Sequence, residues 1–516
     1  MKIVAVNEMR RLEAEAMSRA ADNHTDGISG ADMMELAGSG AALRLLHWIE
    51  NWPARQRMRI IVLAGKGNNG GDAWVVARFL QRECKIPVTL FSVCKRSELK
   101  GDAAYHAELA QYNVEYEEAV EELPPFALSA GSVIVDGLLG TGIKGAPMGA
   151  YKRIIEQVNA SNLPVMALDV PSGLDADTGD GAEAIHADLT VTMGFPKQGI
   201  FLKDGPAVCG RVEVIGIELP LDLVDEAKAV AEAFDLEDAR RLVSRRRSDG
   251  FKGTYGHLLV LGGCGGYVGA PILSALGGVR GGAGLVTLGV PGGCLANPPL
   301  ASLIFRRIGA ADDGCFKASM LKDLYTLLYN KTAVAYGPGT GDMAEPQILA
   351  ELLETDLPMV IDADGLRLLA KNPQMLPRRQ GETVLTPHLG EMQALMIGFG
   401  LDETAPLMTQ AVELAKRTGY IVVLKGRFTI VTEPNGRLTL NMSGGPALST
   451  AGSGDVLTGV IGALLAQGMA AANAARLGVF LHGLAGDLWK GAQRAMSADD
   501  LAELISDAWK EVSVLS

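Results

Sequence analysis

Short runs of apolar residues alternate with glycine-rich turns and amphipathic helical patterns along most of this chain. In the N-terminal half the apolar runs are residues 60–64, 88–91, 133–135, 165–168 and 189–192, and a helical pattern over about residues 7–50 precedes them. Uninterrupted apolar runs of this length are typical of parallel strands that helices cover on both faces. The pattern therefore predicts a doubly wound, Rossmann-like α/β/α sandwich, with ligands at the carboxyl ends of its strands.

The same alternation resumes in the C-terminal half. Its apolar runs are residues 257–261, 285–290, 333–335, 359–361, 384–385 and 421–424. Two further runs, 428–431 and 438–440, flank Pro434-Asn435-Gly436, a turn sequence that predicts a β-hairpin. Residues 218–250, between the halves, are charged and poor in apolar residues. We therefore predict an N-terminal domain over residues 1–225, a linker over 226–244 and a second α/β/α domain over 245–516.

Composition narrows the class of partner. The chain has 516 residues, of which 48% are hydrophobic, so it can form more than one packed core. Its net charge is −13, which argues against nucleic acid or an anionic membrane as the main partner. The one basic run, Arg245 to Arg247, fits a solvated linker better than a phosphate clamp.

Three further features restrict the cellular setting. The six cysteines include no C-x-x-C pair, which disfavours a zinc site or a disulfide framework. Charged residues interrupt the N-terminus before a signal peptide could form. Residues 456–475 carry no charge over the length of a membrane span, but the glycines and polar residues among them predict two helices joined by a turn. We therefore expect a cytoplasmic protein without a membrane segment.

Polar groups gather where several N-terminal strands end. The first strand runs into Gly67-Asn68-Asn69-Gly70-Gly71-Asp72, and Asp136 and Asp169 end two later strands. Glycines after a strand allow a tight turn and a close approach to phosphate, and the following helix start offers free N–H groups. Taken alone, the loop is as consistent with a generic strand-to-helix turn, and a lone strand-end aspartate is more often a helix cap. Their convergence on one sheet edge favours a site.

These N-terminal motifs resemble those of the NAD(P)H-hydrate epimerases over about residues 1–220. The resemblance implies a potassium ion held by Asn69, Asp136 and Ser172, in keeping with the preference of hard cations for oxygen ligands. It makes Asp169 the candidate acid/base. It also implies that the hydrated dinucleotide is bound by Asn68, Asn69, Gly70, Gly71, Asp72, Gly140, Thr141, Gly142, Ile143, Lys144, Gly145, Ala146 and Asp169.

Two N-terminal positions leave alternatives open. Ala73 stands where the family usually has glycine, which predicts a slightly stiffer loop. Lys197, in Phe195-Pro196-Lys197, matches a family position, but an ordinary surface salt bridge explains it equally well.

The most informative motif of the C-terminal half is Gly452-Ser453-Gly454-Asp455. At a helix start, successive backbone N–H groups of such a motif can face a transferring phosphoryl group, with the aspartate in reach of an acceptor hydroxyl. A plain helix cap is the weaker alternative. Further glycine-rich segments support a nucleotide site: Lys252 to Gly256, Gly266 to Ala270, Gly337 to Gly341, and Lys425-Gly426. His388 lies beside Pro387 at a strand end, where a ligand contact is as plausible as a satisfied polar group.

Together these motifs resemble the ribokinase-like superfamily over about residues 245–516, and within it the ADP-dependent NAD(P)H-hydrate dehydratases. The resemblance implies ADP as co-substrate, accompanied by magnesium. It implies hydrate contacts from Ala270, Gly339, His388 and Asp455, and nucleotide contacts from Lys425, Gly426, Arg427, Phe428, Thr429 and Gly454, with Asp455 as base. The sequence departs from the family at Leu389, Arg367 and Phe251.

Both halves together predict an enzyme that acts on hydrated NADH and NADPH, epimerising them and then dehydrating the S epimer with ADP. Two alternatives remain: a vitamin or sugar kinase fused to an isomerase domain, and a nucleotide-binding scaffold. The sequence does not decide between ADP and ATP as donor. Because large glycine-rich α/β enzymes often assemble, we also expect a homo-oligomer.

Overall fold

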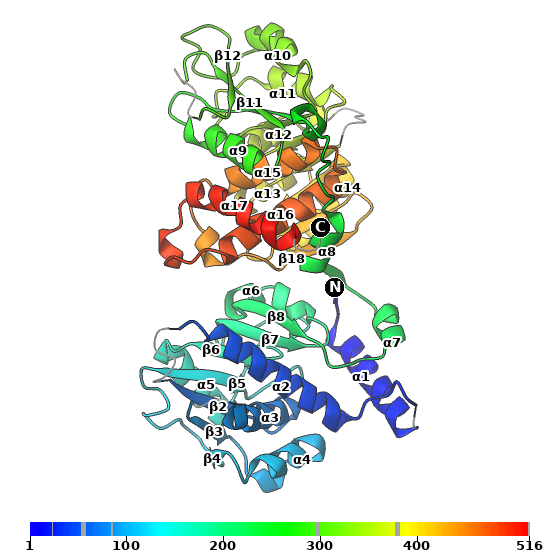
Figure 1. The fold of residues 1–516 in the computed structure, drawn as a ribbon, viewed down its shortest axis with the longest axis vertical. Helices are drawn as coiled ribbons and strands as arrows, with labels where there is room; N and C mark the ends of the chain where they lie inside the picture. Colours follow the sequence, from blue (N-terminus) through cyan, green and yellow to red (C-terminus); the bar gives the residue numbers. More distant parts are fainter. Residues whose placement is uncertain (23, 53–57, 84–85, 295–299, 377–381, 514–516) are drawn as a thin grey trace. The chain divides into compact units, whose positions relative to one another are not determined.

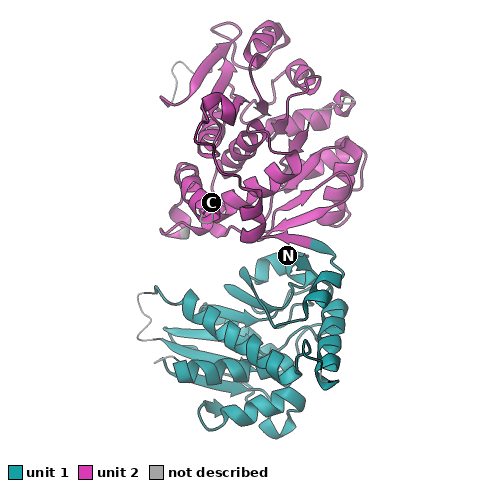
Figure 2. Ribbon diagram, turned by 45° about the vertical axis from the view of Figure 1, so that its right-hand side comes forward, with its two compact units in different colours: residues 1–231 teal, residues 232–516 magenta. Residues whose placement is uncertain are grey.

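The chain folds into two compact units, residues 1–231 and 232–516 (Figure 2). The computed structural model describes residues 1–22, 24–52, 58–83, 86–294, 300–376 and 382–513. Figure 1 labels the helices and strands of both units. Each unit is an α/β structure built on its own sheet, so each is described by itself.

The sheet of the N-terminal unit is entirely parallel, with strand order β4-β3-β2-β5-β6-β7-β8. The strands are β2 (Arg59–Ala64), β3 (Val88–Ser92), β4 (Glu115–Glu117), β5 (Ser132–Gly137), β6 (Val165–Leu168), β7 (Leu189–Met193) and β8 (Arg211–Ile215). From β2 the chain adds strands first on one side and then, from β5, on the other. The switch between β2 and β5 is the position at which doubly wound sheets bind ligands.

Helices cover both faces of this sheet, as the predicted sandwich requires. Alternate residues of β2 enter separate cores: Ile60 packs with residues of the first helices, and Ile61 packs with Ile154 and Val158 on the opposite face. The predicted N-terminal helical stretch forms α1 and α2. The helical elements and the short first strand are β1 (Lys2–Ile3), α1 (Val6–Ala21), α2 (Gly30–Trp48), α3 (Asn68–Glu83), η2 (Arg96–Glu98), α4 (Gly101–Ala110), α5 (Gly149–Ser161), η3 (Gln198–Phe201), α6 (Gly205–Val208) and α7 (Leu221–Glu226).

The C-terminal sheet is mostly parallel, with order β9-β18-β17-β16-β15-β14-β13-β10-β11-β12, and only β17 runs against its neighbours. Its strands are β9 (Ala231–Phe234), β10 (His257–Leu261), β11 (Leu285–Pro291), β12 (Ile304–Ile308), β13 (Ala333–Tyr336), β14 (Met359–Ile361), β15 (Thr383–Leu385), β16 (Ile421–Leu424), β17 (Ile430–Thr432) and β18 (Leu438–Asn441). The predicted hairpin forms between β17 and β18. A second switch point lies between β10 and β13.

Two tightly packed helices carry the core of the C-terminal unit. The uncharged segment 456–475 forms the end of α15, a turn and the start of α16, as predicted. Glycines let α15 lie against α9, because a Cβ on Gly459 would stand 1.9 Å from the Ser274 carbonyl oxygen. No helix of the described ranges is long and apolar enough to cross a membrane. The helices are α8 (Leu236–Leu242), η4 (Lys252–Tyr255), α9 (Gly269–Arg280), η5 (Ala318–Met320), α10 (Leu321–Leu328), α11 (Pro346–Leu353), α12 (Asp364–Lys371), η6 (Pro373–Met375), α13 (Leu389–Gly398), α14 (Leu407–Thr418), η7 (Pro446–Leu448), α15 (Ser453–Ala466), α16 (Ala471–Asp487), η8 (Gln493–Ala495) and α17 (Ala498–Ser513).

The stretch that the sequence assigned to a linker contains regular structure. It includes β9 and α8, and β9 pairs with β18 in the C-terminal sheet. Phe234 and Ala239 of this stretch are buried in the C-terminal core. These residues therefore belong to the fold of the second unit, although their sequence is charged.

Candidate active sites

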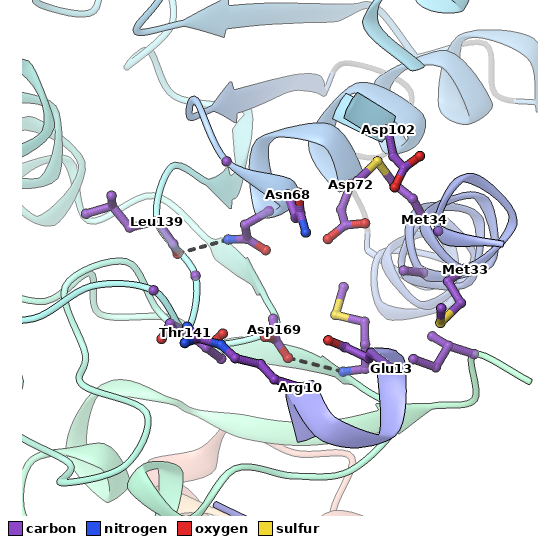
Figure 3. A pocket seen from close by; sticks show the side chains of 18 of the residues that line it. Arg10, Glu13, Met33, Met34, Asn68, Asp72, Asp102, Leu139, Thr141 and Asp169 are labelled. Atoms are coloured by element: carbon purple, nitrogen blue, oxygen red, sulfur yellow. Dashed lines mark hydrogen bonds between the residues drawn. The ribbon is translucent and has the colours of Figure 1, made fainter. Parts of the chain in front are cut away.

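A cavity of about 600 Å³ lies at the carboxyl edge of the N-terminal sheet, beside the switch between β2 and β5 (Figure 3). It is lined by eight of the residues proposed to bind the dinucleotide: Asn68, Asn69, Asp72, Gly140, Thr141, Gly142, Ile143 and Asp169. The proposed residues Lys144, Gly145 and Ala146 are exposed and outside the lining. Gly70 and Gly71 also lie outside it and serve close packing, since a Cβ on Gly70 would meet the Gly65 carbonyl oxygen at 2.0 Å.

Asp169 is held in the cavity by a buried lysine. Its Oδ1 accepts hydrogen bonds from Lys197 Nζ at 2.5 Å and from Thr192 Oγ1 at 3.0 Å. Lys197 is 2% exposed, so the surface salt bridge considered for it is wrong. Asp169 has a φ of +63°, a left-handed conformation that is uncommon for a residue with a Cβ and that recurs at functional sites. The surroundings thus present this carboxylate in one orientation.

Asp136, Ser172 and Asn69 lie around the Leu139 carbonyl oxygen at the edge of this cavity, because Ser172 and Asn69 both donate hydrogen bonds to that oxygen. Ser172 donates through Oγ to Asp136 Oδ1 at 2.6 Å and through its backbone N–H to Oδ2 at 2.8 Å. Asn69 donates through Nδ2 to the Leu139 carbonyl oxygen at 2.9 Å, which leaves its buried Oδ1 without a hydrogen-bond partner. Burial raises the pKa of Asp136 to about 6, against the lowering effect of the Ser172 hydrogen bonds. This cluster is rich in oxygen atoms and has one unused acceptor.

Two more carboxyl groups face the same cavity. Asp72, on α3, has its pKa raised well above the usual range by burial and by the charges of Asp169 and Glu13. Burial also raises the pKa of Glu13, which the Lys197 charge opposes. Glu13 and Arg10 come from α1, which the sequence had not connected with the site. No local motif marks them, because only the tertiary fold brings α1 to this edge.

In the C-terminal unit a cavity of about 530 Å³ collects most of the proposed nucleotide-binding residues. His388, Lys425, Gly426, Arg427, Thr429 and Gly454 line it. Phe428 is buried outside the lining, where the Arg427 guanidinium stacks 4.6 Å from the centre of its ring. The wall also includes His482, which the sequence had not singled out; burial lowers its pKa to about 4, and its Nε2 lies 2.9 Å from the Ser453 carbonyl oxygen.

The floor of this region is a buried charge cluster. Lys425 donates through Nζ to Asp362 Oδ1 at 2.8 Å, and Thr458 donates through Oγ1 to Asp362 Oδ2 at 2.6 Å. Burial lowers the pKa of Lys425, but the charges of Asp362 and Glu391 outweigh this effect and leave it raised. Burial, followed by the Asp362 charge, raises the pKa of Asp455 to about 7 despite nearby Lys425. Asp455 therefore lies near the ordinary range for a general base at neutral pH.

The first turn of α15 places Asp455 among the backbone donors of a helix start. Gly452 precedes the helix with a φ of +89°, and the helix begins at Ser453. The first N–H groups of a helix have no intrahelical acceptor, and they form the positive end of its dipole. A Cβ on Gly454 would lie 3.2 Å from Lys425 Nζ, so glycine leaves room for the lysine to approach this turn.

His388 and the remaining predicted contacts lie on neighbouring loops. His388 caps α13, where its Nδ1 accepts hydrogen bonds from the N–H groups of Gly390 at 3.0 Å and Glu391 at 3.2 Å. Ala270 and Gly339 lie side by side, because a Cβ on Gly339 would be 3.3 Å from the Cβ of Ala270. Neither these two residues nor Asp455 lines the C-terminal cavity described above.

The sequence departures lie mainly at the surface. Leu389 and Phe251 are exposed. Arg367 is half exposed, and its NH1 lies 4.0 Å from Asp364 Oδ1. Ala73 is buried, and its Cβ lies 2.6 Å from the position that a Cβ on Gly137 would occupy.

Known proteins match both units. The family described as "YjeF-related protein N-terminus" matches residues 30–199, and the family described as "NAD(P)H-hydrate dehydratase" matches residues 258–507. A solved structure of an ADP/ATP-dependent NAD(P)H-hydrate dehydratase from Bacillus subtilis, co-crystallised with ATP and Mg²⁺, is similar to part of the chain. It is 27% identical with a TM-score of 0.46, covering 55% of this chain and 99% of that one.

Curated relatives match along almost the full length. The bifunctional NAD(P)H-hydrate repair enzyme Nnr of Moorella thermoacetica is 35% identical over 98% of this chain and 96% of its own. The enzyme of the same name from Coxiella burnetii is 36% identical over 96% of each chain. On this similarity, which spans both units, the chain belongs to the family of bifunctional NAD(P)H-hydrate repair enzymes.

Proposed function

We propose that this chain repairs hydrated NADH and NADPH at two separate active sites. The N-terminal unit interconverts the R and S epimers of the hydrate. The C-terminal unit dehydrates the S epimer with ADP, yielding the reduced dinucleotide, AMP and phosphate. The observation that carries the proposal is that each unit places an acid/base aspartate, Asp169 or Asp455, beside a buried lysine at the carboxyl edge of its own sheet.

At the N-terminal site Asp169 exchanges protons with the hydroxyl on C6 of the hydrated nicotinamide. Lys197, Thr192 and the Met193 N–H hold its Oδ1, so the carboxylate does not need to reorganise during the reaction. Asn68, Asp72 and the 140–143 loop form the walls that position the dinucleotide. The proposal fits the cavity's placement at a topological switch point, where dinucleotides commonly bind.

At the C-terminal site Asp455 removes the proton from the C6 hydroxyl of the S epimer. The hydroxyl oxygen then attacks the terminal phosphoryl group of ADP, and AMP departs. The N–H groups at the start of α15 and the Lys425 charge stabilise the transferring phosphoryl group. Phosphate then leaves C6 with the C6–O electron pair, C5 loses a proton to solvent, and its C–H electron pair forms the C5–C6 double bond of the dihydronicotinamide.

The Asn69 cluster suits a potassium ion. Asn69 Oδ1 is buried and unpaired, and Asp136 and Ser172 contribute further oxygen atoms beside it. A bound cation would neutralise the buried Asp136 and fix the two loops that carry the cavity wall. If this assignment is right, potassium should raise the melting temperature of the wild-type chain above that in sodium, whereas Asn69→Leu should abolish the difference.

Magnesium would accompany the phosphates of the nucleotide. Mg²⁺ bound to a nucleotide takes most of its ligands from phosphate and water, so a dedicated protein cage is not required. Among the described residues, no group of three or more His, Cys, Asp or Glu side chains is arranged to hold a metal. Because phosphate and water supply most of its ligands, we expect magnesium to bind together with ADP, which titration calorimetry with and without ADP would measure.

A direct assay tests the proposed function. The chain is incubated with a mixture of R and S hydrated NADH and ADP, and the return of absorbance at the dihydronicotinamide band is followed. We expect complete recovery together with AMP and phosphate in equal amounts. A stable phosphorylated product would favour the alternative of a sugar or vitamin kinase, and ATP in a parallel reaction identifies the preferred donor. The expected homo-oligomer and cytoplasmic location stay predictions.

A further inference from the structure

The N-terminal cavity has carboxyl groups on two walls, and only Asp169 has an acid/base role in the proposed reaction. Asp169 follows β6 on one side, held by Lys197. Asp72 projects from α3 on the other, and Figure 3 shows both carboxyl groups directed into the space between. Among the described residues none hydrogen-bonds to the Asp72 carboxyl group. A carboxyl group that lines a cavity without a protein partner is free to act on a ligand.

The proposed epimerisation needs proton transfer on both faces of the substrate ring. Inversion at C6 requires the hydroxyl to leave one face and water to add to the other. The departing hydroxyl takes a proton and leaves as water with the C6–O electron pair, while the ring nitrogen lone pair forms an N1–C6 double bond. Water then adds to the opposite face, the double-bond pair returns to nitrogen, and the added water loses a proton. One acid and one base are required, on opposite sides.

Resting on the proposed function, we propose that Asp72 is the second proton-transfer residue of the N-terminal site, acting on the ring face opposite Asp169. In one direction Asp72 gives its proton to the leaving hydroxyl and Asp169 accepts a proton from the adding water. In the other direction their roles are reversed, as interconversion of two epimers demands. Each turnover moves one proton from one aspartate to the other, and exchange with solvent water restores the starting state. Protons and electrons then balance without any co-reactant besides the substrate and water.

The charged groups around Asp72 favour its protonated form, as a proton donor requires. The groups facing it are Glu13 and Arg10 from α1, Asp102 from α4, Asp169 after β6, and Lys197 after β7. Burial, then the negative charges of Asp169 and Glu13, raises the pKa of Asp72, and Lys197 only partly opposes this. Asp169 instead accepts hydrogen bonds from an ammonium, a hydroxyl and an amide. Asp72 is thus placed to hold a proton, and the three donors around Asp169 orient its carboxylate to accept one, which is the division that paired acid/base work requires.

Glu13 acts through Asp72 and is a positioning residue in this scheme. When it is ionised, its charge favours the protonated form of Asp72. Glu13→Gln removes that charge and should lower the pKa of Asp72. In this variant Asp72 should lose its proton at a lower pH than in the wild type.

The decisive experiment measures conversion of purified R hydrate to S hydrate by chiral chromatography, across pH, in the full chain. We expect Asp72→Asn to lower kcat about 100-fold or more while KM changes little. The wild-type rate should fall as pH rises and Asp72 ionises, and Asp72→Asn should lack that fall. Asp180→Asn, which changes an exposed carboxylate outside the cavity that pairs with Lys203, should keep the fall at the wild-type pH. Glu13→Gln should move it to lower pH.

A raised KM with wild-type kcat, and an intact fall with rising pH in Asp72→Asn, would make Asp72 a binding residue only and overturn the inference. If the wild-type chain does not interconvert the epimers at all, the proposed function itself fails. Circular dichroism melting reports whether Asp72→Asn is folded. If it is not, the Glu13→Gln variant decides, because a fall that stays at the wild-type pH would contradict a titrating Asp72.

Discussion

The two sites use the same kinds of residue but connect them differently. In the N-terminal unit the buried lysine bonds directly to the proposed acid/base residue, with Lys197 Nζ at 2.5 Å from Asp169 Oδ1. In the C-terminal unit Lys425 donates a hydrogen bond to Asp362 at 2.8 Å. It acts on the proposed base, Asp455, only through its positive charge. The pKa of Asp455 therefore remains raised to about 7.

This difference shows that the position of the lysine decides how it acts on each aspartate. Lys197 holds the Asp169 carboxylate by a direct hydrogen bond, which fixes its orientation. Burial, followed by the charge of Asp362, raises the pKa of Asp455 to about 7, and Lys425, which bonds to Asp362, only partly opposes this.

Removing the C-terminal base should have the largest effect. Asp455→Asn keeps the shape of the side chain but cannot accept the hydroxyl proton. We expect ADP-dependent dehydration of S hydrate to fall by about 100-fold or more, toward the upper range for a general base. ADP binding, measured by calorimetry, should persist. Near-normal turnover in this variant would exclude Asp455 as the base.

Removing the N-terminal acid/base residue should separate the two activities. Asp169→Ala should lower epimerisation by about 100-fold while leaving dehydration of pure S hydrate intact. With a mixture of epimers, absorbance should return rapidly to near half of the total and then rise slowly. If both epimers are converted at the wild-type rate, either Asp169 is not catalytic or the second unit accepts both. Chiral analysis of the remaining hydrate distinguishes these cases.

Disrupting the buried C-terminal ion pair should reduce stability. Asp362→Ala removes the hydrogen-bonded partner of the mostly buried Lys425 and leaves it, among the described residues, only Glu391 at 3.9 Å, so we expect a loss toward the lower end of the about 3–5 kcal/mol that breaking a buried pair costs. We expect a clearly lower midpoint of denaturant unfolding for the isolated C-terminal unit. Asp249→Ala is the matched control, because its partner Arg247 is exposed, and exposed pairs contribute only about 0–1 kcal/mol. Equal effects of the two substitutions would contradict the assignment of a buried pair.

The pH dependence should differ between the two activities. The proposed base must be ionised, so kcat/KM for dehydration should fall as pH drops below about 7, the pKa of Asp455. The fall should approach roughly tenfold per pH unit in the acid limit. Epimerisation should not share this acid fall. Stopped assays of each reaction with purified epimers would measure both pH profiles. Coinciding profiles would contradict the proposed difference between the two sites.

Separating the units should have the smallest effect. Residues 1–231 and 232–516 each carry a sheet, a core and a candidate site, so we expect two folded proteins with activities within about twofold of the full chain. A C-terminal protein that begins at residue 240 should be less stable, because it lacks β9. Failure of both C-terminal versions to fold would show that the chain needs its N-terminal part.

Local sequence patterns predicted the features that depend on local chemistry. Continuous apolar runs identified the central strands, and the Pro434-Asn435-Gly436 turn identified the β17–β18 hairpin. The edge strands β8 (Arg211–Ile215) and β12 (Ile304–Ile308) were not predicted. Strand β12 carries charged residues on both of its faces, Arg306 and Arg307, so its apolar pattern is weaker. Strand β9 has only four residues, one of them Glu232, and it lies within a charged stretch, so it was not predicted either.

The parts of the sites that depend on long-range packing were not predictable. Motifs located Asn69, Asp136 and Asp455, because each follows or begins a recognisable element. Glu13 lies on an ordinary amphipathic helix, and its neighbours in sequence give no indication of the cavity that it faces. The partnership of Lys425 with Asp362 joins residues 63 positions apart, and no spacing rule connects them.

The Lys425–Asp362 pair also affects how this chain can change by mutation. Replacing either member alone leaves a mostly buried charge, and breaking a buried pair costs up to about 3–5 kcal/mol, which is a large share of the about 5–15 kcal/mol that typically separates folded from unfolded protein. Two matched replacements would avoid that cost but would have to arise together. A protein that evolved from this chain and no longer needed the dehydratase activity would therefore tend to keep Lys425 and Asp362. Selection for folding alone would act against the loss of either residue.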